Sequence, residues 1–294
     1  MVRRTAGIVR ELTAVLEAST KAFSVNGKKE SIQRYLGQMH SVVFNADELE
    51  IIRGQPDSRR RFLDAAIVSI HPPFVQTLSD YARVIRQKNS LLQTAKAGEY
   101  SLEKTAELLA PWNEQLIVHA SRIHRSRLRY VSRLNEVLEK KLFDREEVSI
   151  RYRSALEGKG DISEFDQLLS ERLALRIPAE MAAGHSLIGP HRDDLDIFFD
   201  GRDLRKFGSA GQQRSALLLM QLANISVYYA QQNEYPIFLL DDIDAELDFR
   251  RIGRLLEYLD GKTQTIITTS KESFKDEFGS GAKILRVRNG RAES

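Results

Sequence analysis

The feature that most restricts the fold of this chain is a short apolar segment that ends in two aspartates. Residues 236–242 read Pro-Ile-Phe-Leu-Leu-Asp-Asp. An unbroken apolar run of this length is typical of a strand buried on both faces of a parallel sheet. Ligands of open α/β sheets bind at the carboxyl ends of such strands. The segment therefore predicts that Asp241 and Asp242 stand at a ligand-binding sheet edge.

The second half of the chain alternates strand-like and helix-like segments. Apolar runs of one kind or the other occupy residues 195–199, 215–229, 237–240, 250–259, 265–269 and 284–287. This alternation favours a layered α/β domain with a largely parallel sheet.

The start of the chain has a shorter period. Residues 13–18 and 21–25 read as two strands, and Asn26-Gly27 supplies the tight turn on which strands commonly end. A helix over residues 8–18 is the competing interpretation, because Ile8, Leu12 and Val15 also fit helical spacing.

Residues 57–142 have helical periodicity. We expect Asp57 and Ser58 to cap a helix that begins at Arg59, since short oxygen-bearing side chains accept the free N–H groups of a first turn. The helix should stop before Pro72, because proline cannot continue it. Further helices are expected at 74–95, at 101–109 and, opened by Pro111, from there to about residue 142.

The chain is therefore expected to have three segments. They are a β-rich segment at 1–56, a helical lobe at 57–165 and an α/β lobe at 166–294, with a polar, glycine-containing joint at 155–165. The sequence contains no internal repeat and no low-complexity tract.

The last helix of the middle segment has an apolar and a basic face. At about 100° per residue, one side carries Leu116, Ala120, Ile123, Val131, Leu134 and Leu138, and the other carries Arg122, Arg125, Arg129, Arg133 and Lys140. A solvated outer face is one interpretation. The functional alternative is a rail of arginines along DNA phosphates, because a guanidinium can donate two hydrogen bonds to one phosphate.

A candidate anion site opens a long helix in the α/β lobe. Residues 207–214 read Phe-Gly-Ser-Ala-Gly-Gln-Gln-Arg. Ser209 can present its hydroxyl beside the free N–H groups of a helix start, where the helix dipole favours negative charge. Gly211 would let a phosphate approach the backbone closely. An ordinary capped helix is the alternative for this segment alone.

The composition excludes several classes of protein. The 294 residues include no cysteine, which excludes disulfides, cysteine-bound zinc, iron–sulfur clusters and thiol catalysis. No apolar run approaches the ~18 residues that cross a bilayer, and no apolar secretory segment follows the basic start. We therefore expect a cytoplasmic protein without a membrane partner. The net charge of +3 does not by itself identify a nucleic-acid-binding protein.

Four segments in order resemble the parts of an ABC-type ATPase head. The helix start at 209–212 resembles the signature motif, the paired aspartates a Walker B element, Ala-Glu-Leu-Asp at 245–248 a D-loop, and Thr-Ile-Ile-Thr-Thr at 265–269 a switch strand. Further matches are Gly-Pro-His-Arg-Asp-Asp-Leu at 189–195, Arg-Gly at 53–54 with Pro56, Arg-Arg-Arg-Phe-Leu-Asp at 59–64, and Pro-Trp-Asn-Glu-Gln-Leu at 111–116. Together they resemble the RecF family of bacterial DNA replication and repair proteins, over about residues 26–289.

This resemblance implies a function. The fold would be an α/β, ABC-type P-loop ATPase head with an inserted helical lobe, and its cofactors would be ATP and Mg²⁺. RecF-like proteins dimerise with ATP between two heads, clamp single- and double-stranded DNA, and work with recombination mediator proteins in gap repair and the SOS response. Hydrolysis in the family is slow.

The resemblance also assigns roles to residues. Asp241 would hold Mg²⁺, and Asp242 would be the catalytic base. Thr268 or Thr269 stands where many ABC heads carry a switch histidine, and a hydroxyl in that place fits slow turnover. The remaining assignments fall at the dimer interface: Ser209, Gly211 and Gln212 would contact the γ-phosphate bound to the opposite subunit, and Asp248 would lie on the loop that crosses the interface.

One part of such a head is missing from the sequence. A P-loop reads Gly-x-x-x-x-Gly-Lys-Ser/Thr, and the nearest segment, 22–29, has Ala22 for the first glycine and Lys29 for the hydroxyl residue. Either the chain is a fragment or mis-started gene product, or it is a truncated homologue that acts as a non-hydrolysing DNA-binding or scaffold subunit with an intact head. In both cases we expect no ATP hydrolysis by this polypeptide alone and an uncovered sheet edge.

Three other sites are weighed against simpler explanations. His119 and His124 are five residues apart, so they do not share a helix face as zinc ligands would. A nuclease metal site could use Asp193, Asp194 and Asp196, although 195–199 also read as a plain strand. The arginines at 59–61 could touch DNA or nucleotide, or pair with nearby acids.

Overall fold

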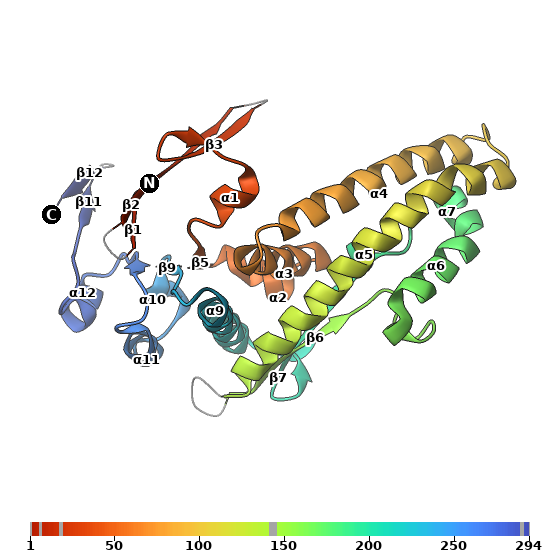
Figure 1. Cartoon of the computed structure of the whole chain (residues 1–294). Helices are drawn as coiled ribbons and strands as arrows, with labels where there is room; N and C mark the ends of the chain where they lie inside the picture. The colour runs from red at the N-terminus through yellow and green to blue at the C-terminus, as the bar shows by residue number, and fades with distance from the viewer. Residues whose placement is uncertain (1, 6–7, 18–19, 141–145, 289–290, 294) are drawn as a thin grey trace.

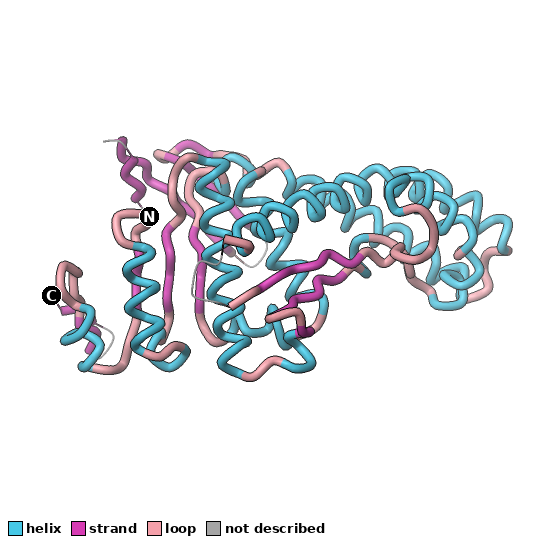
Figure 2. The backbone as a smooth tube through the Cα atoms, turned by 90° about the horizontal axis from the view of Figure 1, so that it is seen from below, coloured by secondary structure: helices cyan, strands magenta, loops and turns pink. Residues whose placement is uncertain are grey.

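The computed structural model describes residues 2–5, 8–17, 20–140, 146–288 and 291–293. Its centre is a three-stranded parallel sheet in the order β10 (Thr265–Ile267), β9 (Ile237–Leu240), β5 (Ser41–Phe44). A long helical arm extends from this sheet to one side (Figure 1), and the far end of the arm contains helices and loops without strands (Figure 2). The parallel sheet predicted from the alternating pattern is confirmed.

One face of the central sheet is buried against helix α9 (Ala210–Gln232). Val42 and Phe44 of β5 and Phe238 and Leu240 of β9 are at most 3% exposed. Residues between them, such as Leu239, are half-buried. This alternation follows from the pleat of a strand, which directs successive side chains to opposite faces.

The outer edge of the sheet at β10 is open. Among the described residues β10 pairs only with β9. Ile266 of this strand is 49% exposed. The uncovered edge expected from the missing P-loop is therefore present.

The chain begins with an antiparallel sheet of β1 (Val2–Thr5), β2 (Ile8–Leu16), β3 (Lys21–Val25) and β4 (Lys28–Lys29). Asn26 and Gly27, with φ of +50° and +75°, form the predicted turn between β3 and β4. The competing helix over 8–18 is wrong. Its apolar residues have no common face to bury, since Leu12 is 4% exposed while Val15 and Leu16 are 48% and 69% exposed.

Short elements then lead into the arm: α1 (Ile32–Leu36), the 3₁₀ turn η1 (Asp47–Leu49), α2 (Glu50–Arg53) and α3 (Pro56–Ile70). The predicted cap of α3 is wrong. Gln55 is the N-cap and Pro56 occupies the first turn, so Asp57 and Ser58 lie inside the helix. Proline is favoured there because it has no N–H that needs a partner and its φ already suits a helix.

The arm is built on α4 (Phe74–Lys96) and α5 (Leu102–Leu138). The predicted gap between the helices at 74–95 and 101–109 is confirmed, and Gly98 lies in it with φ of +86°. The predicted division of α5 at Pro111 is wrong, because one continuous helix runs through it. Interior proline costs about 3 kcal/mol, but Leu109 and Leu116 on either side are 0% exposed, and burial of each contributes about 1.5–3 kcal/mol.

The α5 helix ends four residues earlier than predicted. Its last residue is Leu138, and Leu142, the predicted end, lies outside the described residues. The apolar face predicted for this helix is buried throughout: Leu116, Ala120, Ile123, Val131, Leu134 and Leu138 are at most 6% exposed.

The remaining elements connect the arm to the sheet. An antiparallel sheet joins β6 (Val148–Arg153), β7 (Asp194–Phe199) and β8 (Arg202–Asp203). Between β6 and β7, the turn η2 (Ile162–Glu164) and the helices α6 (Phe165–Leu175) and α7 (Ile177–Ala183) return along the arm, and η3 (Pro190–Arg192) precedes β7.

The helix α8 (Leu204–Phe207) leads into α9. After β9 come α10 (Ile243–Glu246), α11 (Phe249–Leu259), α12 (Glu272–Phe278), β11 (Arg286–Arg288) and β12 (Arg291–Glu293). In the described part of the chain, none of the helices combines the length and apolar character that a membrane span requires.

Candidate functional site

The three parallel strands end at one edge of the central sheet. Phe44 of β5 and Ile267 of β10 are both in register with Leu240 of β9. The next residues, Asn45, Asp241 and Thr268, therefore emerge side by side. The Asp241 N–H donates to the Phe44 carbonyl at 3.0 Å, and the Thr268 N–H donates to the Leu240 carbonyl at 2.9 Å.

Thr268 is bonded to both aspartates of the pair. Its hydroxyl donates to Asp241 Oδ1 at 2.5 Å and accepts from the Asp242 N–H at 2.9 Å. Both aspartates are exposed. Asp242 has φ of +50°, which turns the chain sharply into α10. The acids predicted at the sheet edge thus lie there, and Thr268 rather than Thr269 contacts them.

The loop after the acid pair is anchored at its start by an ion pair, Asp244 with Lys271, that the sequence analysis did not single out. Asp244 is buried, and Lys271 lies 3.2 Å from its Oδ2 atom. Asp248 is exposed and caps α11, with its Oδ1 accepting from the Arg251 N–H at 2.9 Å. The loop that carries Asp248 is therefore held at both ends.

The helix start at Ser209 forms a capping box. The Gln212 N–H donates to the Ser209 hydroxyl at 3.2 Å, and the Ser209 N–H donates to Gln212 Oε1 at 2.9 Å. A methyl group at Gly211 would meet only the Ser209 hydroxyl oxygen, at 3.9 Å. All three residues are exposed. The capped-helix alternative is thus realised, and the space in front of this turn is open to a ligand.

An ion pair links the Ser209 helix to the loop after the acids. Arg214, on the second turn of α9, donates to Glu246 Oε2 at 2.7 Å. Glu246 stands two residues before Asp248. The sequence gives only a weak signal for this ion pair, because Arg214 and Glu246 each look like an ordinary surface charge.

A second contact holds the loop before Ser209. Arg53, at the end of α2, donates to Gln213 Oε1 at 2.6 Å, and Gln213 Nε2 donates to the Gly208 carbonyl at 3.3 Å. The segment that follows β5 thereby reaches the Ser209 helix start. The sequence indicated Arg53 only as part of the Arg-Gly motif at 53–54.

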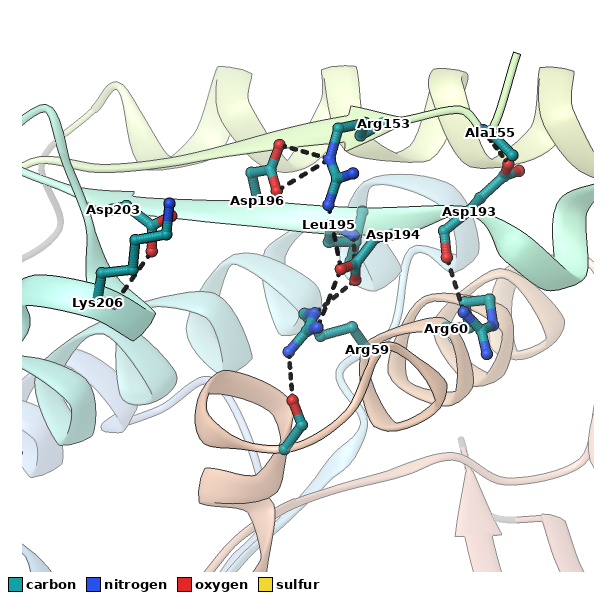
Figure 3. A network of polar contacts seen from close by, with 11 residues as sticks. Arg59, Arg60, Arg153, Ala155, Asp193, Asp194, Leu195, Asp196, Asp203 and Lys206 are labelled. Carbon is teal, nitrogen blue, oxygen red and sulfur yellow. Dashed lines mark hydrogen bonds and ion pairs between the residues drawn. The ribbon is translucent and has the colours of Figure 1, made fainter. Parts of the chain in front are cut away.

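The structure does not support the alternative of a nuclease metal site, because arginines pair with the carboxylates of Asp194 and Asp196. The Asp193 carboxylate accepts from Tyr152 and Ala155 instead. Arg59 donates to both oxygens of Asp194, at 2.6 and 3.1 Å, and Arg153 lies 3.4 Å from Asp194 and 3.1 Å from Asp196 (Figure 3). Burial alone would raise the pKa of Asp194, but the hydrogen bonds from Arg59 and from the Leu195 N–H hold it below its usual value.

Asp193 occupies the centre of a second, deeper group. Its carboxylate accepts from the Tyr152 hydroxyl. The carboxylate also accepts from the Ala155 N–H at 2.7 Å, and the Asp193 carbonyl accepts from Arg60 at 2.7 Å (Figure 3). Of the three arginines at 59–61, two therefore pair with acids or carbonyls of the 189–195 motif. Arg61 is exposed and lies 3.0 Å from Asp57.

Arg127 joins this group from α5, and sequence reasoning missed it. The guanidinium donates two hydrogen bonds of 2.8 Å to Asp64 and one of 2.8 Å to the Pro190 carbonyl. Its side chain is 4% exposed. A signal existed: at about 100° per residue, position 127 falls away from the basic stripe and toward the apolar face, where a charge needs a partner.

The basic stripe of α5 is on the surface. Arg122, Arg125 and Arg129 are exposed, and Arg133 is half-buried. Arg125 lies 3.6 Å from Asp166, with both side chains more than half exposed. The geometry suits either a solvated face or a phosphate contact.

A histidine metal site is not formed. No cluster of three metal-ligating side chains occurs within the described ranges. His124 is buried and stacks on Phe165 with a centroid distance of 3.9 Å.

Known proteins resemble this chain over most of its length. A family model described as "AAA domain, putative AbiEii toxin, Type IV TA system" matches residues 86–269. The DNA replication and repair protein RecF of Bacillus mycoides is 35% identical over 298 residues, covering 98% of this chain and 78% of the relative. RecF of Geobacillus kaustophilus is 31% identical, with the same coverage.

Solved structures agree with these relatives. The recombination mediator protein RecF–ATPrS of the RecFOR pathway superposes with a TM-score of 0.86 at 28% identity, covering 99% of this chain and 78% of that one. The corresponding RecF–ATP structure has a TM-score of 0.84 at 28% identity and covers 97% and 76%. This chain therefore belongs to the RecF family of DNA replication and repair proteins.

Proposed function

We propose that this chain takes part in ATP-dependent binding of single- and double-stranded DNA, in support of recombinational gap repair and the SOS response. The observation that carries the proposal is the meeting of Asp241, Asp242 and Thr268 at one edge of a parallel sheet. Relatives solved with ATP have the same fold. Work in the cytoplasm, beside recombination mediator proteins, is part of the proposal.

Asp241 fits a magnesium site. Its carboxylate offers the hard oxygen atoms that Mg²⁺ prefers, it is exposed, and one of its oxygens accepts the Thr268 hydroxyl at 2.5 Å. The hydrogen bond fixes the orientation of the carboxylate. Bound there with ATP, Mg²⁺ would neutralise phosphate charge. Asp242, which makes no side-chain cap bond to α10, is free to orient an attacking water.

Ser209, Gly211 and Gln212 serve the γ-phosphate held by an opposite subunit in an ATP-dependent dimer. Support comes from the open, capped start of a 23-residue helix, whose dipole favours an anion. Asp248 lies on the loop that would cross the dimer interface, and the Arg214–Glu246 ion pair ties that loop to the same helix. A displacement of the Asp248 loop would therefore also displace the Ser209 helix start.

The absence of a P-loop motif from the sequence limits what one polypeptide can do. Without backbone N–H groups and a lysine around the phosphates, we expect no hydrolysis by this chain alone. The second candidate function is a non-hydrolysing DNA-binding or scaffold subunit that pairs with an intact head.

We assign DNA contact to Arg122, Arg125, Arg129 and Arg133. Their common stripe on α5 supports the assignment. The division into 1–56, 57–165 and 166–294 would then separate an ATPase lobe, a DNA-contacting helical lobe and a second ATPase lobe, although α6 and α7 of the third segment pack on the helical lobe.

Two variants separate the two functions. In a mixture with a RecF that carries the P-loop, ATP-dependent association should be lost when Ser209→Arg fills the helix start. In the leading function, Asp241→Asn also weakens Mg²⁺-dependent binding of a fluorescent ATP analogue to this chain. In the scaffold function, Asp241→Asn has no effect and Ser209→Arg alone matters. Association that neither variant alters would contradict both.

A further inference from the structure

A cleft lies along the outer edge of β5, on the opposite side of the sheet from β10. Its volume is about 350 Å³, within the range of roughly 300–1,000 Å³ that ligand sites occupy. Its walls come from β5, from the segment of η1 and α2, from α3 and from α9. None of the acid-pair or Ser209 residues lines it, so it is separate from the site above.

The β5 strand offers unpaired backbone groups to this cleft. Among the described residues it pairs only with β9. The His40 and Phe44 carbonyls accept from β9, and because the N–H and C=O groups of a strand alternate between its two edges, Ser41 and Val43 turn theirs to the cleft. Both residues are half-buried and line the cleft.

A buried imidazole nitrogen shares this wall. His40 lines the cleft and stacks on Tyr228 with a centroid distance of 4.8 Å. Its Nε2 atom is buried without a hydrogen-bond partner. A buried polar atom without a hydrogen-bond partner is unfavourable, so a polar group that enters the cleft and bonds to it would be favoured. Burial also lowers the pKa of His40 to about 4, which leaves the ring neutral.

The charges around the cleft are mostly acidic. The described residues that line it include the acids Asp47, Glu48 and Glu50 and one cation, Arg61, which already lies 3.0 Å from Asp57. The Glu48 carboxylate accepts from Gln221 Nε2 at 3.3 Å. Burial and the neighbouring Asp47 raise the pKa of Glu48, so a cation close by would be favoured.

We infer that this cleft binds an extended segment of a protein partner by strand addition to β5, with a lysine or arginine of the segment facing Glu48. The Ser41 and Val43 backbone groups supply main-chain hydrogen bonds, and alternate side chains supply specificity. The acidic wall selects a basic segment. This inference is independent of the proposed ATP function.

The test uses two fluorescein-labelled heptapeptides, Thr-Lys-Val-Lys-Val-Lys-Thr and its glutamate counterpart, titrated against the full chain by anisotropy. The lysine peptide should bind, and the glutamate peptide should not. Glu48→Gln with Glu50→Gln should weaken binding about 10-fold, the size expected for loss of a charge-assisted contact. Glu257→Gln, an exposed acid on α11, is the matched control and should change nothing.

The backbone contribution is measured separately. Ser41→Pro removes one outward N–H at the first residue of the strand, where proline is tolerated, and should weaken the lysine peptide several-fold. Hydrogen exchange at residues 41–44 should slow when the peptide is bound. Equal binding of both peptides, no binding of the lysine peptide, or binding that survives both sets of substitutions would overturn the inference. If the double variant does not fold, Asp47→Asn, at an exposed residue, replaces it.

Discussion

Replacement of Arg127 by methionine should destabilise the fold far more than any change on the surface of the same helix. Arg127 makes three hydrogen bonds of 2.8 Å, two to Asp64 and one to the Pro190 carbonyl, and lies 3.7 Å from Asp193. Its side chain is 4% exposed. Arg127→Met therefore leaves two carboxylates without their cation, and Asp193 is 2% exposed.

The structure sets the size of the effect. Removing one partner of a buried ion pair costs about 3–5 kcal/mol. With a urea m-value of about 3 kcal/mol/M for a chain of this size, the midpoint of unfolding should fall by about 1–2 M. The exposed neighbour Arg122→Met is the matched control, and a surface change of this kind should stay within about 0.5 kcal/mol.

A double variant separates the charge from the packing. Asp64→Asn combined with Arg127→Met removes one of the two stranded carboxylates, so it should be more stable than Arg127→Met alone. Urea unfolding followed by circular dichroism measures all three variants. Equal midpoints for Arg127→Met and Arg122→Met would refute the reasoning, because the network would then contribute nothing to stability.

Three further outcomes are expected. Replacing Arg122, Arg125, Arg129 and Arg133 by glutamine should weaken DNA binding. The slope of log binding constant against log salt concentration should fall in magnitude by up to about 3.6, at about 0.9 per lost phosphate contact. Anisotropy titrations between about 50 and about 200 mM salt measure this slope, and an unchanged slope would assign the stripe to a solvated face. Burial lowers the pKa values of His40, His124 and His191 from 6.5 to about 4. The stability that these neutral rings contribute is therefore full above pH 6.5 and falls as the pH drops from 6.5 toward 4. Urea midpoints that do not change across this window would contradict the burial of neutral histidines. Purified chain with ATP and Mg²⁺ should release no phosphate above background, and steady release in a coupled phosphate assay would show that a P-loop motif is dispensable here.

The sheet and its edge could be predicted because their signals are local. The apolar run before Asp241 has the composition of a buried strand, and the structure forms β9 over the expected residues. Asn26 and Gly27 have φ of +50° and +75°, conformations that few other residues adopt without strain. The apolar face of α5 followed from its periodicity alone.

Features decided by distant contacts were missed. The α5 helix runs through Pro111 because the leucines on either side are buried. Their burial depends on packing against distant segments, so it cannot be predicted from the local sequence. Arg53 meets Gln213 across 160 residues of sequence, and Arg127 meets Asp64 across 63. The strand at 195–199 was predicted, but the arginine partners of Asp194 and Asp196 were not, because they lie on other elements.

The central claim is that the Ser209 helix start of this chain completes an ATP site on a neighbouring head, and crosslinking tests it most directly. The chain has no cysteine, so Ala210→Cys gives a single thiol beside Ser209 on an exposed turn. It is mixed with a P-loop-bearing RecF that carries one cysteine in the loop after its own acid pair, and a bismaleimide is added. We predict a crosslink with ATP and Mg²⁺ that is absent with ADP and is lost when Ser209→Arg is added. A crosslink of equal yield without nucleotide, or one that survives Ser209→Arg, would contradict the claim.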